Sequence, residues 1–212
     1  MEKGTFIKLV GQRLAGRDYQ DMAEFIDSEM ELVQTSILEG GDFLPWFLEA
    51  EAQVVVPEGA GVLELPEGFI RPDTSKGLFL DTDLGPQELL QYDWNSMQKD
   101  TGESVGMPCG FALVGGGWRV GPVPDREYSG TWWYMKKDVP PSQITDDESN
   151  AWLSYAANVM VAEVGKVCAG VLRDGDAYKM FADQGLRAWA DLKQADSERR
   201  FNSQELYFFG GN

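Results

Sequence analysis

Hydrophobic residues repeat at helical spacing at both ends of the chain and at strand spacing between them. Over residues 5–39 and again over 146–196, apolar side chains recur every three or four positions, as on the buried face of an amphipathic helix. From about residue 50 to 138, short β-branched and aromatic runs alternate with glycine and proline turns, which is typical of strands. This change of period predicts an α+β fold, a helical bundle with a β-rich insertion.

Each end of the chain is expected to form a pair of helices. Asp18 is a suitable N-cap for the second helix, and Gly40–Gly41 should end it. Thr145–Glu148 has the composition of a capping box and predicts the start of the third helix. The last helix should begin near Asp174 or Asp176.

The middle region predicts strands joined by tight turns. Gly115–Gly117 could cradle a phosphate only if a helix began directly after it. Pro122 and Pro124 follow instead, so we interpret the three glycines as a hairpin turn. A short helix is expected at residues 87–97, introduced by Pro86. Strands are expected at residues 51–56, 61–66, 77–80 and 126–137.

The sequence predicts a single domain over residues 1–197, with the β insertion at 42–140, and then an extended tail at 198–212. The tail has no periodicity but is rich in aromatic residues. Such a segment is costly to leave in water. It must either fold back on its own domain or dock on another protein, and we favour docking.

The composition excludes several kinds of site. The chain has no histidine, which removes Ser-His-Asp and Cys-His nucleophiles and most zinc sites. Cys109 and Cys168 are far apart and predict free, buried or half-buried thiols in a reducing compartment. A net charge of −17 opposes binding to DNA or an anionic membrane. No signal peptide or membrane-spanning segment is expected.

Three acidic clusters are candidates for catalytic or metal sites. Asp146–Glu148 and the pair Asp174 and Asp176 stand at expected helix starts, where carboxylates act as caps. Asp81 and Asp83 are followed by residues without the ligand spacing of a calcium loop. We therefore expect no catalytic, metal or cofactor site.

One aromatic run leaves another function open. Trp132–Tyr134 could form a platform that stacks on sugar rings, as in a carbohydrate-binding or host-contact module. Because alternate side chains of a strand face opposite ways, at least one of the three should belong to the core. A small hydrolase that uses two carboxylates is a third possibility.

The order of features resembles the head-to-tail adaptor (connector) proteins of tailed bacteriophages, especially the short-tailed type. The resemblance lies in FLPWFL before a strand, the LP-x-x-F step of ELPEGFIRP, and the hairpin, strand and helix start across residues 109–153. The closing AYKMFADQGLRAWADLKQADSERR is similar to the last helix of that family. The match covers most of the chain but includes no invariant catalytic motif.

This resemblance implies a structural virion protein without enzymatic activity. Such adaptors form a ring, commonly dodecameric, between the portal protein and tail (nozzle or hub) proteins, and they extend the DNA channel without binding DNA specifically. The protein would be made in the host cytoplasm and sit at the head–tail junction. The C-terminal segments of the family commonly reach into the portal. The portal-binding residues expected here are Arg199, Arg200, Phe201, Leu206, Tyr207, Phe208 and Phe209.

Overall fold

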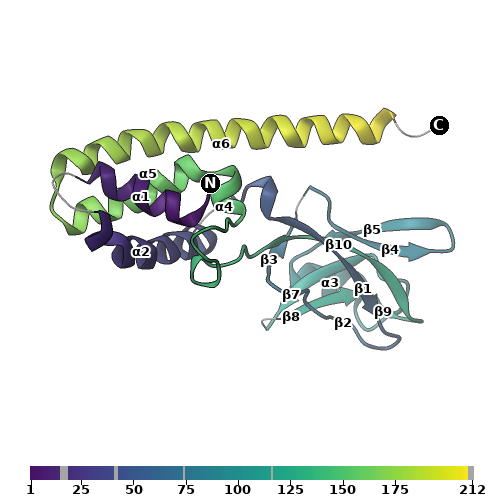
Figure 1. Ribbon diagram of the computed structural model, residues 1–212. Helices are drawn as coiled ribbons and strands as arrows, with labels where there is room; N and C mark the ends of the chain where they lie inside the picture. The colour runs from purple at the N-terminus through teal and green to yellow at the C-terminus, as the bar shows by residue number, and fades with distance from the viewer. Residues whose placement is uncertain (15–18, 41–42, 74, 116, 210–212) are drawn as a thin grey trace. The chain divides into compact units, whose positions relative to one another are not determined.

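Figure 1 shows the computed structural model, which describes residues 1–14, 19–40, 43–73, 75–115 and 117–209. At 19–21 and 201–209 only the backbone is described. The chain divides into a helical unit, Met1–Leu48 with Asp138–Asn212, and a β unit, Glu49–Lys137. The α+β class with helices at both ends is confirmed. No helix in the described ranges is long and apolar enough to span a bilayer.

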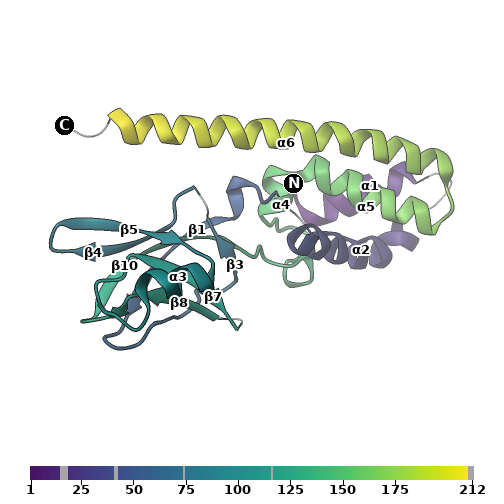
Figure 2. The ribbon, with the colours of Figure 1, turned by 180° about the vertical axis from the view of Figure 1, so that it is seen from behind.

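The helical unit is organised around one apolar helix, α5. This helix contacts α1, α2 and α6, and Figure 2 shows α6 and α2 on opposite sides of it. Its buried face includes Gly165 and Cys168, and Gly165 lets the ring of Phe181 on α6 approach closely. The elements of this unit are α1 (Lys3–Arg13), α2 (Tyr19–Gly40), η1 (Trp46–Leu48), η2 (Pro141–Gln143), α4 (Ala151–Tyr155), α5 (Ala157–Val171) and α6 (Gly175–Phe209).

The β unit is a curved sheet in the order β1-β10-β4-β5-β7-β8-β2, with β3 also pairing with β10. Its outermost strands, β1 and β2, contact each other. Trp132, Phe111 and Trp118 lie at the centre of its core. The elements are β1 (Glu49–Val56), β2 (Val62–Leu63), β3 (Phe69–Pro72), β4 (Leu78–Thr82), β5 (Gly85–Gln91), α3 (Trp94–Thr101), β6 (Val105–Gly106), β7 (Gly110–Val114), β8 (Gly117–Gly121), β9 (Val123–Pro124) and β10 (Tyr128–Lys136).

The hairpin predicted at Gly115–Gly117 is confirmed. Strands β7 and β8 pair antiparallel, with Val114 opposite Gly117. Gly115 has a φ of 57°, a conformation that glycine adopts without strain. Gly116 lies outside the described residues, as does Asp18, the cap expected for the second helix.

The helix predicted at residues 87–97 is wrong. Residues Gly85–Gln91 form β5, which pairs antiparallel with β4 and in parallel with β7. Gly85, at a φ of 106°, closes the turn before it, and the side chain of Leu89 enters the core. The helix α3 begins only after Asp93, whose carboxylate accepts the backbone N–H of Ser96.

The third helix also starts later than the capping box predicts. The Thr145 N–H does donate to a Glu148 carboxylate oxygen, at 2.7 Å, as a capping box predicts. This bond closes a turn, however, and does not begin a helix. The carbonyls of Asp146 and Glu148 accept N–H groups from the first residues of α1, so this turn is bonded to the start of the N-terminal helix. Asn150 is the cap of α4, since its side chain accepts the Leu153 N–H at 3.0 Å.

The C-terminal segment differs from the extended tail that the sequence predicts. Helix α6 runs without a break from Gly175 to Phe209. Its start is as expected, because Asp174 accepts the Ala177 N–H at 3.0 Å. No glycine or proline occurs from Leu186 to Phe209, so the backbone meets no helix-breaking residue before Gly210.

Candidate functional site

The last part of α6 with described side chains is fixed to the segment that precedes the β unit. Asp196 is 6% exposed, and one of its carboxylate oxygens accepts the backbone N–H of Trp46 at 2.6 Å. Its other oxygen accepts the guanidinium of Arg200 at 2.8 Å. Arg200 also donates to the carbonyl of Leu44 at 3.4 Å. We call Asp196, Arg199 and Arg200, with Leu44 and Trp46, the α6 anchor.

Arg199 completes the anchor. Its guanidinium lies over the indole of Trp46, 3.7 Å from the ring centroid, in a cation–π contact. Arg199 and Arg200, two of the seven predicted portal-binding residues, therefore contact their own helical unit. For the other five the structure describes only the backbone, which is helical. The sequence thus placed seven candidates in a tail, and the structure places them on one helix.

An aromatic cluster supports the anchor from the bundle side. Trp46 and Phe47 pack against Tyr155, with ring centroids 4.9 and 5.6 Å apart respectively. Phe47 also meets Trp152 edge-on at 5.2 Å, and Trp152 continues to Trp189 on α6 at 6.4 Å. The motif FLPWFL therefore joins α6 to α4 through ring contacts.

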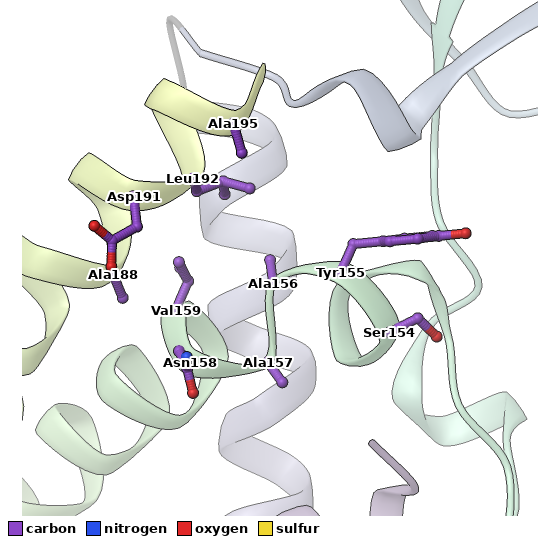
Figure 3. Close-up of a pocket in the computed structure, with 10 residues that line it drawn as sticks. All are labelled: Ser154, Tyr155, Ala156, Ala157, Asn158, Val159, Ala188, Asp191, Leu192 and Ala195. Carbon is purple, nitrogen blue, oxygen red and sulfur yellow. The ribbon is translucent and has the colours of Figure 1, made fainter. Parts of the chain in front are cut away.

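A groove of about 380 Å³ lies beside this cluster. Figure 3 shows that the junction between α4 and α5 forms one wall and α6 the other. Its lining is dominated by alanines and Leu192, and the only carboxylate is Asp191. Within the described residues no three His, Cys, Asp or Glu side chains gather as a metal-binding group. The lining residues therefore do not include the pair of carboxylates that a two-carboxylate hydrolase needs.

Each of the three acidic clusters has its own local contacts. Asp83, on the β unit, is paired with Arg126 at 3.1 Å. The Asp147 carboxylate accepts the hydroxyl of Thr145 at 2.6 Å, and this bond lowers the pKa of Asp147. Asp174 caps α6. Each cluster thus has a local partner or a turn to stabilise.

The aromatic run at residues 132–134 is divided between the two faces of β10. Trp132 and Tyr134 point inward and are 0% and 5% exposed. Trp133 points outward, and the ammonium of Lys76 lies 4.3 Å from its ring centroid. Only one of the three rings is therefore on the surface, and a cation already covers it, so the run is not a three-ring platform for sugars.

Sequence reasoning missed the central residue of the anchor. Asp196 was not singled out because its partner Trp46 is 150 positions away in the chain. The available signal was its spacing of four residues from Arg200 on a helix, which favours an ion pair.

The two cysteines are free, as expected, but differ in exposure. Cys168 is buried and Cys109 is exposed, so the expectation of a buried or half-buried thiol is wrong for Cys109. Burial, with a smaller effect from the Glu29 carboxylate, raises the pKa of Cys168 to about 12.

Comparison with known proteins identifies one family. The sequence profile of the family described as SU10 adaptor protein matches residues 1–205, which include both units and most of α6. No curated protein matches the chain. The family description indicates a phage adaptor, a structural protein of the virion that interacts with other head and tail proteins. It does not specify tail length, so the short-tailed type stays a prediction. Because the match extends over nearly the whole chain, this protein belongs to the SU10 adaptor protein family.

Proposed function

We propose that this protein forms a ring between the portal and the tail, at the head–tail junction of the virion. The ring, expected to be dodecameric, extends the DNA channel and provides a platform for tail (nozzle or hub) proteins. The chain is made in the host cytoplasm and has no catalytic role. Its membership of a phage adaptor family across residues 1–205 supports this function.

The C-terminal end of α6 is the proposed portal contact. The observation that carries this proposal is that α6 continues for nine residues, 201–209, beyond the anchor at Asp196–Arg200. The sequence of this extension includes Phe201, Leu206 and the run Tyr207–Phe209. Large aromatic residues supply most of the binding energy at many interfaces. Several copies around a ring would bind the portal together, which multiplies a weak single contact.

The acidic composition suits a channel through which DNA passes. A net charge of −17 repels the phosphate backbone, so that DNA meets little friction from specific contacts. Helix α2 contains no lysine or arginine. We therefore expect no DNA binding at physiological salt.

Truncation after Arg200 tests the portal contact. The truncated chain keeps Asp196 and Arg200, so its helix content should fall only by the residues removed and its melting temperature should stay within a few degrees. Binding to purified portal, followed by sedimentation and electron microscopy, should be lost. A variant with alanine at Phe201, Tyr207, Phe208 and Phe209 should behave in the same way.

A matched control is Leu84→Ala, at the β4–β5 turn, where the leucine is fully exposed. This change also removes an exposed apolar side chain, yet portal binding should be unaffected. Normal binding by the truncated chain would show that the portal contact lies elsewhere. Unfolding of the truncated chain would show that residues 201–209 belong to the core of the helical unit.

A further inference from the structure

Two helices of the helical unit each expose one leucine among charges of a single prevailing sign. Leu32 of α2 is 62% exposed, and Leu186 of α6 is 75% exposed. Isolated exposed leucines are ordinary on protein surfaces. These two leucines differ because charged side chains of mostly one sign surround each of them.

The face around Leu32 is acidic. Glu24, Glu31 and Glu39 stand eight residues before, one before and seven after this leucine, and the helical period puts all three opposite the buried stripe of α2. No residue of α2 is a lysine or arginine. Within the described part of the chain, none of the three glutamates makes an ion pair.

The face around Leu186 is mainly basic. Lys179, Arg187 and Lys193 stand seven residues before, one after and seven after it, and all three are exposed. Asp176 and Asp183 are exposed carboxylates on the same side of the helix, so the cations exceed the carboxylates by one. The ammonium of Lys193 lies 5.7 Å from the ring centroid of Phe43. Lys179 and Arg187 have no ion-pair partner among the residues described.

The two faces match in length as well as in charge. At the rise of an α-helix, the outer charges lie about 10 to 12 Å from each leucine on both helices. Leu32 can therefore meet Leu186 while the two outer carboxylates meet the two outer cations. With parallel helices Glu31 and Arg187 also lie on the same side of the contact, so parallel packing pairs all three charges. Figures 1 and 2 show the two helices on opposite sides of α5, so one copy cannot bring these faces together.

We propose that the α6 face of one copy packs on the α2 face of the next. Contact between two different faces of the same chain is head-to-tail, and repetition of such a contact closes into a ring when the rotation permits. This interface rests on the proposed ring function and specifies which surfaces build the ring.

Charge exchange tests the interface on the full-length chain. One variant carries Glu24→Lys and Glu31→Lys, and the other carries Lys179→Glu and Arg187→Glu. Each alone should weaken self-association at least about tenfold, because like charges then face each other. A mixture of equal amounts should restore assembly, since the reversed α2 face of one variant meets the reversed α6 face of the other, and the unchanged α6 and α2 faces also meet. Analytical ultracentrifugation over a concentration series, with and without portal, gives the readout.

A control variant carries Lys99→Glu and Glu103→Lys, an exchange of exposed charges in the β unit. It should associate like the parent chain. The proposal is overturned if either reversed variant associates normally, if the mixture fails to assemble, or if the parent stays monomeric at all concentrations with and without portal.

Cross-linking distinguishes a head-to-tail contact from a symmetric one. In a Cys109→Ser background, a chain with Leu32→Cys and Leu186→Cys should give a ladder of oligomers with a short bismaleimide. Leu186→Cys alone should give no dimer. Dimers from that single variant would point to contact between two α6 helices and would overturn the proposal.

The portal contact and the lateral contact can fail separately. If truncation after Arg200 leaves portal binding intact while the mixture experiment succeeds, the proposed docking helix is wrong and the lateral interface stands. If truncation abolishes portal binding but charge reversal has no effect on association, the lateral interface is wrong.

Discussion

Lys3 is buried although it carries a charge, and its three contacts hold separate segments together. Its ammonium donates to the carbonyls of Pro141 and Ile144, at 3.0 and 3.4 Å. It also forms an ion pair with Asp27 at 2.9 Å. A single side chain thus ties α1 to α2, to η2 and to the residue that follows η2.

Loss of this charge should destabilise the helical unit. Lys3→Met leaves two carbonyls and the Asp27 carboxylate without their donor. Because the Asp27 side chain is 36% exposed and can be hydrated, we expect a loss of about 3 kcal/mol, the low end for a broken buried pair. Lys8→Met, on the exposed side of α1, should change stability by less than about 0.5 kcal/mol. Equal effects in urea unfolding would contradict this role for Lys3.

Cys168 gives the protein a specific sensitivity to high pH. Its pKa is raised from 9.0 to about 12, so between these values the folded state binds the proton more tightly than the unfolded state does. Rising pH therefore favours unfolding. Between pH 8 and pH 11 we expect this group to reduce stability by about 2 to 3 kcal/mol.

The comparison with Cys168→Ala isolates this effect from other groups that ionise at high pH. The alanine variant should be less stable at pH 8 but should lose less stability on going to pH 11. Urea unfolding of the parent and of Cys168→Ala at pH 8 and at pH 11 gives, for each protein, the slope of the free energy of unfolding against pH. Identical slopes would mean that the thiol keeps an ordinary pKa in the fold.

At the scale of elements, the close packing of α5 against α6 requires a residue without a side chain, Gly165. A Cβ atom at Gly165 would lie 2.4 to 2.5 Å from three ring atoms of Phe181, which is fully buried. Gly165→Ala should therefore cost about 1 to 3 kcal/mol through overpacking, although alanine is the better helix former by about 0.5 to 1 kcal/mol.

Gly170, on the same helix, is the matched control. An added Cβ there would have its nearest neighbours on Tyr178, at 3.8 and 3.9 Å. Gly170→Ala should be neutral or stabilise by about 0.5 to 1 kcal/mol, since only helix propensity changes. The melting temperatures of the two variants should shift in opposite directions, or by clearly different amounts, relative to the parent protein.

Some of the helices and strands could be predicted from the sequence and others could not. The helices at both ends and the β7–β8 hairpin were predictable because periodicity and turn glycines are local signals. Residues 87–91 were mistaken for a helix because glutamine, glutamate and leucine favour helix locally, whereas pairing with β4 and β7 decides their structure. Arg199 and Arg200 were named because the resemblance to phage adaptors implies a C-terminal portal contact. Asp196 was not, because its contact with Trp46 is visible only in three dimensions.

For the whole molecule, the two compact units predict two unfolding events. Gly130 of β10 pairs with Leu80 of the neighbouring strand β4, and a Cβ there would be 2.1 Å from the carbonyl oxygen of Phe79. Gly130→Ala should therefore lower the transition of the β unit and leave the other unchanged. Gly165→Ala should do the reverse. Scanning calorimetry would contradict this independence if both variants shifted one common transition.

The chain enters and leaves the β unit on two neighbouring strands, β1 and β10. Its first strand begins at Glu49, which pairs with Met135 near the end of β10, and directly opposed residues of antiparallel strands lie only about 5 Å apart. A module whose two ends are so close can be exchanged by recombination without rerouting the chain on either side. Phage genomes could then trade the β unit as a cassette while retaining the helical unit.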